Sequence, residues 1–378
     1  MKRGKITKLL ALAMTAGVLF TGCGNATAGT TEVQKSSAVE QTDSTEVKEE
    51  ENTAVTDTVD AATDTTADTA TDTAEAPAEL TKVRYAAMTG ANTLWFGLIG
   101  QETGIFEKYG LDVEITEFAS GIETVDSITM DQADIGFVTD FAGLNRFGNT
   151  QGRSDIKFFE EQSRSGAYAL YVNPEKISTI EDLKGKKVLV VKGTFLEYLN
   201  AVTAEQGGFT MADVEEVPVS GMPDAFAAAS SGGADAMWTA GDGATKLAEL
   251  GWTPIKRQTD IGIFTYTFHV ASNQYLTDNA ETVQKFIQAY EEVNQYTYEN
   301  QDEAAEIINA KTGYDPELFK KVLAASEVKA ELTQEAVDAL VKVDEWAVNN
   351  GYYSPNLNVT DYINSDALKA VFPENVTY

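Results

Sequence analysis

The sequence predicts an α/β fold of two lobes, in which each lobe is a mainly parallel sheet flanked by helices. Two observations carry this prediction. The same order of strand, small polar loop, helix and strand occurs twice in the chain, and the residues after Asn273 carry helical periodicity. The second observation adds helices to one lobe only, so the two lobes are expected to differ in size.

Each repeat begins with a strand that runs through a small polar loop into a helix. Val83–Met88 leads in this way to an apolar helix that ends at Gly104. Lys187–Val191 leads to a helix that begins near Phe195. Strands that alternate with helices are typical of units that build a parallel sheet.

The second half of each repeat contains a short strand, a Ser-Gly pair that opens a helix, and an Ala-Asp strand. The aspartate of the Ala-Asp pair follows the aspartate of the short strand by 22 residues in both repeats. A shared order of this length indicates two similar lobes. The segments are Leu111–Glu114, Ser120-Gly121 and Ala133–Phe137 in the first repeat, and Ala212–Glu215, Ser220-Gly221 and Ala234–Trp238 in the second.

The C-terminal part of the chain shows apolar residues at the spacing of one helix face. One such face ends before Gly351, a residue that commonly follows the end of a helix. The residues of the two faces are Val283, Phe286, Ile287, Tyr290 and Val293, and then Val337, Leu340, Val341 and Val348.

Residues 1–23 have the layout of a secretory signal segment. A basic start is followed by the apolar run Leu9–Phe20 and by small residues before Cys23. Twelve residues span about 18 Å as a helix, which is shorter than a hydrocarbon core of about 30 Å. The pattern resembles the bacterial lipobox, with Phe20 where Leu is commoner. This resemblance implies cleavage before Cys23 and lipidation of its sulfur; a short transmembrane stub is the alternative.

Residues 24–80 are predicted to be a disordered acidic Thr/Ala/Asp linker. They carry 14 acidic and 2 basic side chains, and residues 24–79 contain no aromatic residue. Low hydrophobicity with many like charges cannot offset the entropy of ordering. Aspartates recur every four residues from Asp60 to Asp72, which is one face of a helix, but like charges at this spacing repel. The expected role of the linker is to extend the folded part away from a membrane.

The composition excludes several classes of function. The formal net charge is −31, and an acidic body without a basic stripe repels nucleic acid. The chain has one cysteine, Cys23, and one histidine, His269, which excludes a disulfide framework and a Cys/His zinc site. Neither a cofactor nor a metal is predicted. Carboxylate-only catalysis remains open because acids are abundant.

Four segments of the body have a familiar pattern, and they are residues 104–113, 131–136, 180–188 and 232–236. These segments resemble the periplasmic binding proteins for nitrate, sulfonates, taurine and thiamine pyrimidine. The resemblance extends over about residues 82–370 and implies a periplasmic-binding-protein type II fold joined by two hinge strands, Tyr168–Val172 and Thr265–Val270. Residues 81–166 and 270–378 would form lobe 1, and residues 167–269 would form lobe 2.

The resemblance implies an extracytoplasmic substrate-binding protein of an ABC importer. It would be a monomer, lipid-anchored on the outer face of the cell membrane of a Gram-positive bacterium. It would deliver a small organic nutrient to a permease driven by ATPase subunits. The nutrient would be thiamine-pyrimidine-like, amine-bearing, or a sulfonate such as taurine. The alternative is an enzyme on the same fold, either a carboxylate-based hydrolase of the glycosidase type or a pyrimidine synthase. His269 lies in a predicted hinge strand, which favours a structural role for it.

In parallel α/β sheets, ligands bind beyond the carboxyl ends of the strands. This rule and the family resemblance select the candidate ligand-contact residues. Because Asp140, Glu197 and Asp242 are acids among aromatic residues, we expect an amine or another cation. Lys192 and Arg164 are the bases nearby. The full candidate set is Thr89, Asn92, Thr93, Trp95, Ser120, Thr139, Asp140, Phe141, Thr194, Phe195, Glu197, Trp238 and Asp242.

Overall fold

The computed structural model describes residues 79–150 and 153–378, which belong to one compact unit. The predicted signal segment, Cys23 and nearly all of the predicted linker lie outside the described residues. Within the two described ranges, no helix is both long enough and apolar enough to cross a membrane.

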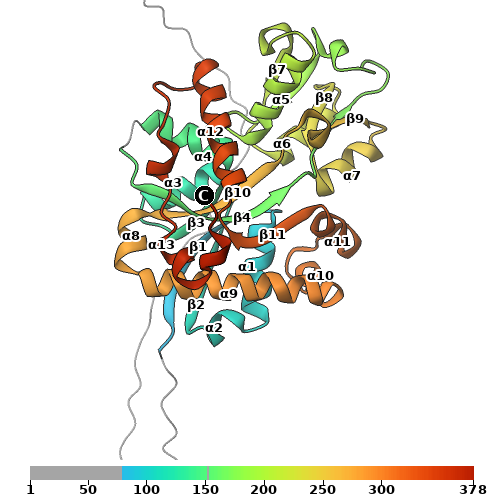
Figure 1. The fold of residues 1–378 in the computed structure, drawn as a ribbon. Helices are drawn as coiled ribbons and strands as arrows, with labels where there is room; N and C mark the ends of the chain where they lie inside the picture. Colours follow the sequence, from blue (N-terminus) through green and yellow to red (C-terminus); the bar gives the residue numbers. More distant parts are fainter. Residues whose placement is uncertain (1–78, 151–152) are drawn as a thin grey trace, which may run out of the picture. The chain divides into compact units, whose positions relative to one another are not determined.

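The first sheet has six strands in the spatial order β2-β1-β3-β10-β4-β11. The strands β1, β2 and β3 are parallel, and β10 is antiparallel to both β3 and β4. Figure 1 shows this sheet with α9 running along its lower side in that view, next to α1 and α2. The strands are β1 (Thr81–Met88), β2 (Leu111–Phe118), β3 (Ile135–Thr139), β4 (Ile156–Ser165), β10 (Thr265–Ser272) and β11 (Ser326–Glu331).

The second sheet has five strands in the order β7-β6-β8-β5-β9. Its parallel part, β7-β6-β8, repeats the arrangement β2-β1-β3 of the first sheet, with antiparallel β5 in the place that β10 occupies there. The predicted repeat and the predicted two-lobed α/β fold are therefore confirmed. The strands are β5 (Ala169–Val172), β6 (Lys187–Val190), β7 (Glu215–Pro218), β8 (Ala236–Thr239) and β9 (Thr253–Arg257).

The predicted strand Ala212–Glu215 is wrong over most of its length. Met211–Asp213 forms a 3-10 turn, η2, and β7 begins only at Glu215. The side chain of Asp213 accepts a hydrogen bond from the backbone N–H of Thr210 at 2.9 Å, which closes this turn. Such local side-chain bonds to the backbone compete with a sheet ladder. The alternation of apolar and polar residues gives no sign of this competition.

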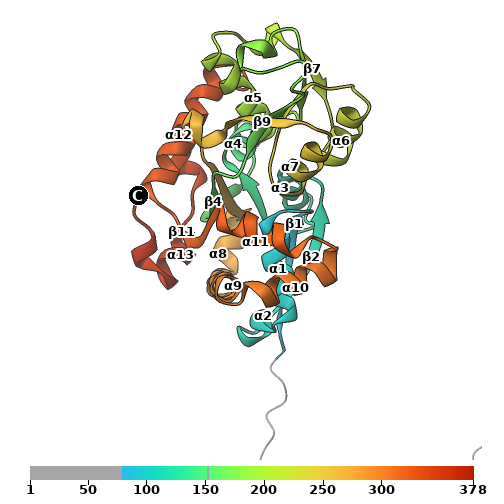
Figure 2. The same ribbon diagram turned by 90° about the vertical axis from the view of Figure 1, so that its right-hand side faces the viewer.

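Thirteen α-helices occur in the described part of the chain. Figure 2 shows the second view of their arrangement, with α6 and α7 close together and α12 along the opposite side. The helices are α1 (Asn92–Glu102), α2 (Ile105–Lys108), α3 (Gly121–Thr129), α4 (Asp140–Thr150), α5 (Phe195–Gln206), α6 (Met222–Ser230), α7 (Gly241–Glu249), α8 (Asn273–Asp278), α9 (Ala280–Glu299), α10 (Gln301–Thr312), α11 (Pro316–Ala324), α12 (Gln334–Asn349) and α13 (Asp366–Val371). The other 3-10 turns are η1 (Glu181–Leu183), η3 (Gln258–Ile261), η4 (Val359–Tyr362) and η5 (Pro373–Asn375).

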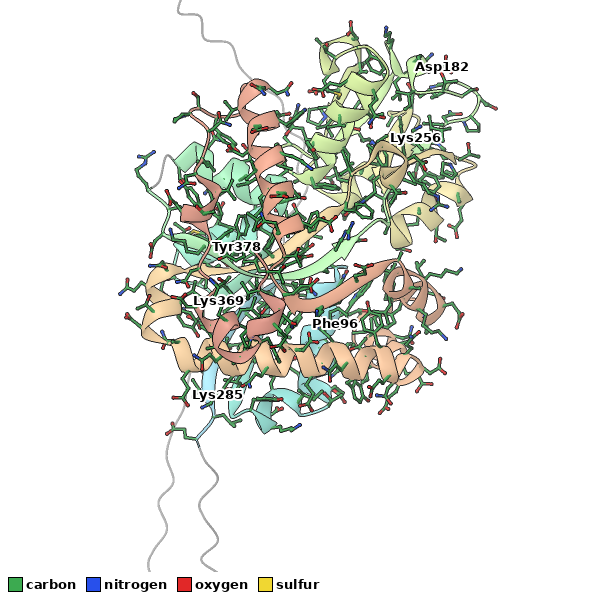
Figure 3. All side chains as sticks on the ribbon, viewed as in Figure 1. Phe96, Asp182, Lys256, Lys285, Lys369 and Tyr378 are labelled. Carbon is green, nitrogen blue, oxygen red and sulfur yellow. The ribbon has the colours of Figure 1, made fainter. Side chains whose placement is uncertain are left out.

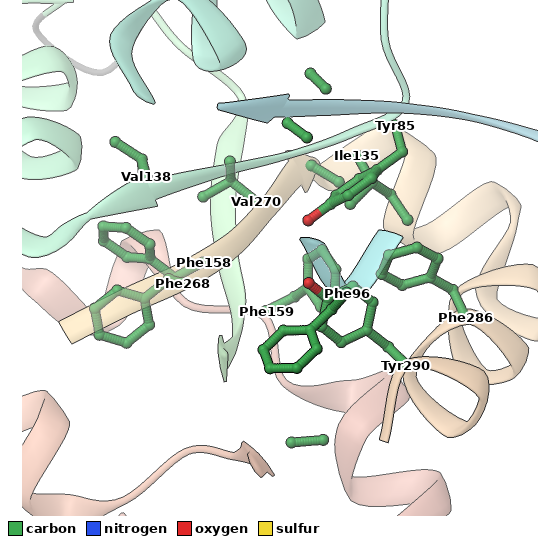
Figure 4. Close-up of a cluster of buried hydrophobic side chains, with 14 of the residues drawn as sticks. Tyr85, Phe96, Ile135, Val138, Phe158, Phe159, Phe268, Val270, Phe286 and Tyr290 are labelled. Atoms are coloured by element: carbon green, nitrogen blue, oxygen red, sulfur yellow. The ribbon is translucent and has the colours of Figure 1, made fainter. Parts of the chain in front are cut away.

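The predicted apolar face of α9 packs into the core of the first lobe. Phe286 and Tyr290 project from α9 toward Tyr85 of β1, as Figure 4 shows. The ring centroids of Tyr85 and Phe286 are 5.6 Å apart, and those of Phe286 and Tyr290 are also 5.6 Å apart. Rings packed at these distances stabilise a core beyond the apolar area that they bury. The helix α9 therefore packs in the core beside the first sheet.

The chain passes between the sheets twice, in residues 166–168 and again in residues 258–264. Gln258, which is fully buried, ties the two crossings together. Its Nε2 donates to the carbonyl oxygen of Ser165 at 2.6 Å, and its Oε1 accepts from the backbone N–H of Tyr168 at 3.0 Å. The predicted hinge strands lie next to these crossings, one in each sheet. Figure 3 shows Asp182 and Lys256 in the lobe of the second sheet, and Phe96 and Lys285 in the other lobe.

Candidate functional site

The loops after β6 and β8 of the second sheet lie against the first lobe. A Cβ atom added at Gly193, after β6, would be 3.2 Å from Cδ1 of Ile122 on α3. A Cβ atom added at Gly241, after β8, would be 2.9 Å from the hydroxyl of Tyr314. Both loops are at the carboxyl ends of parallel strands, where ligands bind in folds of this kind. These loops, and the helix starts that they meet, form the candidate site.

The loop after β1 and the first turn of α1 hold four of the predicted residues. Thr89 is exposed and donates to a carboxylate oxygen of Glu117 at 3.0 Å, and Asn92 is half-buried. Thr93 and Trp95 are buried. Trp95 packs on Tyr314 with a centroid distance of 4.6 Å, so its ring is largely occupied by the core.

Two buried polar atoms in this turn have no partner. Neither the hydroxyl of Thr93 nor the indole Nε1 of Trp95 has a hydrogen bond to any residue that the structure describes. The start of α1 also lacks a side-chain cap from the described residues, because Ala91 precedes the helix. This helix start therefore keeps free backbone N–H donors, which favour a negatively charged group.

Ser120 and Thr139 have local roles in the first lobe. Ser120 caps α3, and its hydroxyl oxygen accepts the backbone N–H of Glu123 at 3.4 Å. The side chain of Glu123 accepts in return from the backbone N–H of Ala119 at 2.8 Å. Thr139 is the half-buried last residue of β3. Ser120 thus opens this helix, as the sequence predicted.

Asp140 is a buried carboxylate at the start of α4. One of its oxygens accepts the backbone N–H of Phe141 at 2.7 Å, and the other accepts the backbone N–H of Tyr266 at 3.3 Å. Burial raises the pKa of Asp140 to about 7, and these two hydrogen bonds only partly oppose the effect. No basic side chain forms an ion pair with Asp140 within the described ranges. Among the three predicted acids, it is the one whose charge is left uncompensated.

Thr194, Phe195 and Glu197 shape the start of α5. The hydroxyl oxygen of Thr194 caps the helix by accepting the backbone N–H of Leu196 at 3.3 Å, and Phe195 is buried in the core of the second lobe. Glu197 is buried and accepts a hydrogen bond from the backbone N–H of Gly193 at 2.6 Å.

The predicted bases beside the site are both compensated by acids of this chain. The Nζ atom of Lys192 lies 3.0 Å from a carboxylate oxygen of Glu197 and 2.6 Å from a carboxylate oxygen of Glu216. Arg164 pairs with Glu335 at 2.9 Å, and its guanidinium lies 4.0 Å from the ring centroid of Phe264. An anionic ligand would therefore find backbone donors more readily than unpaired basic side chains.

The residues that end or follow β8 divide between core and surface. Trp238 is 1% exposed and packs in the core of the second lobe. Its Nε1 has no hydrogen-bond partner in the described part of the chain. Asp242 is half-buried and forms an ion pair with Lys246 one helical turn later. Two of the three predicted acids, Glu197 and Asp242, thus already have cationic partners.

Three aromatic residues join the candidate site without having been predicted. Tyr198 stacks on Phe141 with centroids 5.7 Å apart and planes 15° apart. Trp346 and Tyr352 from the C-terminal part pack on the same Phe141, at 5.8 and 5.1 Å. Tyr198 lies one turn after the helix start that the sequence selected. No sequence pattern pointed to Trp346 or Tyr352, because their proximity depends on how the last helix packs.

His269 is fully buried in the core of the first lobe. Its Nδ1 is 2.8 Å from a carboxylate oxygen of Glu160, and its Nε2 is 3.0 Å from the hydroxyl of Tyr85. Burial raises the pKa of Glu160, and the neighbouring His269 acts against this rise. These contacts are those of a buried structural network.

A cavity of about 270 Å³ lies beside the segments that connect the sheets. It is lined by residues of the first crossing, the second crossing and the turn between α11 and β11. None of the predicted ligand-contact residues is among those that line it. The lining residues are Arg164, Gly166, Phe264, Ala324, Ala325, Ser326 and Glu327.

The chain has the same two-lobed fold as solved periplasmic binding proteins. Residues 94–304, more than half of the chain, match the family model described as NMT1/THI5 like. The protein belongs to this family. The resemblance predicted from the sequence is confirmed.

Two relatives illustrate the similarity in sequence. A "Putative binding protein" of Brucella abortus (strain 2308) is 25% identical over 214 residues, which cover 55% of this chain and 65% of the relative. The chain thus spans slightly less than two thirds of that relative. A "Putative aliphatic sulfonates-binding protein" of Bacillus subtilis (strain 168) is 22% identical over 286 residues, which cover 74% of this chain and 85% of the relative.

Solved structures show the same fold. The aliphatic sulphonate binding protein SsuA of Escherichia coli has a TM-score of 0.64 at 19% identity, over 75% of this chain and 92% of that one. The alkanesulfonate-binding protein SsuA of Xanthomonas axonopodis pv. citri, bound to MOPS, has a TM-score of 0.66 at 16% identity, over 76% and 99%. The desulfurization enzyme DSZB has a TM-score of 0.62 at 15% identity, over 78% and 99%.

Proposed function

We propose that this protein is the substrate-binding component of an ABC importer. It captures a small organic ligand between its lobes outside the cytoplasm and delivers the ligand to a membrane permease. The observation that carries the proposal is the contact of the loops after β6 and β8 with the first lobe. Membership in the NMT1/THI5 like family supports it, as do relatives whose names refer to binding.

The ligand that the site favours is an aliphatic sulfonate that also carries an amine, such as taurine. The start of α1 offers backbone donors without a side-chain cap from the described residues, and such donors suit a sulfonate. Asp140 offers a buried carboxylate without a cationic partner in the described ranges, which suits an amine. A thiamine-pyrimidine-like compound is the alternative ligand, since its amino group and flat ring would also match acids beside aromatic rings.

The internal contacts of His269 favour binding over catalysis. The similarity to DSZB shows that the fold is compatible with an enzyme. In this chain, however, both ring nitrogens of His269 are engaged by Glu160 and Tyr85 inside the core. A general base must come within hydrogen-bond reach of the substrate, either directly or through one water molecule. A histidine in this position does not meet that requirement.

Calorimetric titration of the full chain with taurine, ethanesulfonate and an aminopyrimidine tests the proposal. Taurine is expected to bind and to raise the melting temperature, because a ligand at 100 times its Kd adds about 2.7 kcal/mol of stability. Mass spectrometry should recover the ligand unchanged after prolonged incubation. Chemical conversion of taurine would contradict the binding role, and the absence of binding by all three compounds would contradict the proposed ligand classes.

A further inference from the structure

Four aromatic side chains from the two lobes pack together at the edge of the candidate site. This interlobe aromatic cluster consists of Phe141, Trp346 and Tyr352 from the first lobe and Tyr198 from the second. Tyr198 is the central contact, because it stacks on Phe141 at 5.7 Å and meets Trp346 edge-on at 4.8 Å. Trp346 in turn packs on Tyr352 at 5.4 Å. Each ring contacts at least two others of the cluster, and the contacts of Tyr198 join the two lobes.

Trp346 makes a second contact with the other lobe through its indole nitrogen. The Nε1–H of Trp346 on α12 donates to the carboxylate of Glu205 on α5, with distances of 3.1 and 3.3 Å to the two oxygens. Glu205 follows Tyr198 by seven residues, or about two helical turns, so both lie on one face of α5. Trp346 therefore bridges two turns of α5 with one side chain.

Two rings of the cluster lie at the helix starts that carry predicted ligand-contact residues. Phe141 follows Asp140 directly at the start of α4, and Tyr198 follows Glu197 directly at the start of α5. Tyr352 lies near Glu197, and burial together with this carboxylate raises the pKa of Tyr352. A residue that fixes the distance between α4 and α5 therefore fixes the distance between the two halves of the site.

We propose that Trp346 is the positioning residue of an interlobe clasp, which holds α5 against α4 and so sets the fraction of closed protein. The claim that this fraction controls ligand affinity rests on the proposed function. When only a fraction of a protein is in the binding-competent form, its apparent Kd equals the intrinsic Kd divided by that fraction. Weakening the clasp should therefore open the lobes and lower the affinity by the same factor.

A contact on another helix pair reports lobe opening independently of the clasp. Gly241 at the start of α7 lies against Tyr314, and α7 packs on α11. Neither helix contributes a ring to the interlobe aromatic cluster. Opening of the lobes would expose this contact between α7 and α11 to solvent. A local disturbance around Trp346 would leave the backbone amides of the contact protected from hydrogen exchange.

Hydrogen exchange of the full chain, followed by mass spectrometry without added ligand, tests the clasp. Trp346→Ala should speed amide exchange about tenfold in residues 241–246 and 314–322, as expected for the loss of ring contacts and a hydrogen bond. Glu205→Ala should give a smaller rise in the same segments. Glu205→Gln keeps an acceptor and should resemble the wild type, and Glu175→Ala serves as a control at an exposed acid of the same lobe.

The proposal is overturned if exchange rises only within α5 and α12. If Trp346→Ala does not fold, Glu205→Ala decides by the same criterion. Calorimetry with taurine and ethanesulfonate then separates the clasp from the proposed function. If the wild type binds neither compound, the sulfonate part of the proposed function is wrong, while the exchange result still decides the clasp. If the wild type binds, an unchanged Kd in Trp346→Ala contradicts the effect on affinity.

Discussion

Asp134 and Arg84 are joined by a pair of reciprocal backbone contacts. The carboxylate of Asp134 accepts the backbone N–H of Arg84 at 2.8 Å, and the backbone N–H of Asp134 donates to the carbonyl oxygen of Arg84 at 2.9 Å. Asp235 and Lys187 repeat this arrangement in the second lobe, at 3.0 and 2.7 Å. The Ala-Asp pairs that revealed the repeat in the sequence therefore connect the first strand of each repeat, β1 or β6, to the Ala-Asp strand of the same repeat.

Asp134→Ala and Asp235→Ala should each destabilise the protein without affecting ligand affinity. Each change leaves a strand N–H without its acceptor, which costs about 1–3 kcal/mol. Urea unfolding monitored by circular dichroism measures the loss. Asp112→Ala is the matched control, because this exposed aspartate on β2 makes no hydrogen bond with its side chain in the described part of the chain. Equal midpoints for all three variants would contradict the structural role.

The repeat was visible in the sequence because it rests on local patterns. Strand alternation and helix caps such as Ser120 are set by residues close in the chain, and the Ala-Asp pairs recur at a fixed spacing in the two repeats. The strands β4, β9 and β11 escaped prediction because they are held by partners far along the chain; Ser326 of β11, for example, pairs with Ser165 of β4. In the candidate site, too, local features could be predicted and long-range contacts could not.

Loop positions followed from the strand ends, but the partners of the site residues did not. Nothing in the local sequence indicates that Asp140 accepts a bond from Tyr266, 126 residues away. The pairing of Glu197 with Lys192 could have been suspected from their separation of five residues. The contact of Trp346 with α5 could not, because it depends on tertiary packing.

Cys23→Ser should release the protein from the membrane or leave the precursor uncleaved. Lipidation requires the sulfur of this residue, which lies outside the described residues. Fractionation of cells after metabolic labelling with a fatty acid measures both effects. A variant that stays in the membrane fraction and carries the label would contradict the lipoprotein interpretation.

Deletion of residues 27–79 should leave the melting temperature of the body and its ligand affinity unchanged. The linker contains no aromatic residue, and its charge prevents it from adding to a core. Differential scanning calorimetry of the full and shortened chains provides the comparison. A shift of several degrees would show that part of this segment packs on the folded body.

The stability of the protein should fall as the pH rises from about 4 to about 7, in part because of Asp140. Its pKa is about 7 in the folded protein, against about 3.9 in an unfolded chain. Between these values the folded state holds a proton that the unfolded state has lost. The free energy of unfolding therefore decreases by up to about 1.4 kcal/mol per pH unit and levels off above pH 7.

Asp140→Asn should remove this contribution, so that the variant gains stability relative to the wild type as the pH approaches 7. Chemical unfolding at a series of pH values measures the difference. Glu161, whose pKa burial raises to about 8, contributes in the same direction and must be kept intact in both proteins. Asp242→Asn is the control, because its partner Lys246 is a neighbour on the same helix. Parallel pH profiles for Asp140→Asn and the wild type would contradict the assignment.

The last prediction concerns the charge of the ligand. If an acid faces an amine on the ligand, its neutralisation to Asn or Gln should weaken ligand binding by about 2–5 kcal/mol, because one partner of a buried charged pair is lost. The structure distinguishes the three predicted acids, since Glu197 and Asp242 already pair with Lys192 and Lys246. Asp140 is thus the one expected to matter.

Taurine and ethanesulfonate form a matched pair for this test, because they differ in the amine alone. If Asp140 faces the amine, Asp140→Asn should weaken the binding of taurine and leave the binding of ethanesulfonate unchanged or tighter. Glu197→Gln and Asp242→Asn should change neither affinity much, because each acid is satisfied inside the protein. Calorimetric titration of the three variants with both compounds gives the six comparisons.

An equal loss of affinity for both compounds in Asp140→Asn would instead show that this carboxylate shapes the site through its hydrogen bonds from Phe141 and Tyr266. Wild-type affinity for taurine in all three variants would rule out an acid–amine contact at these positions.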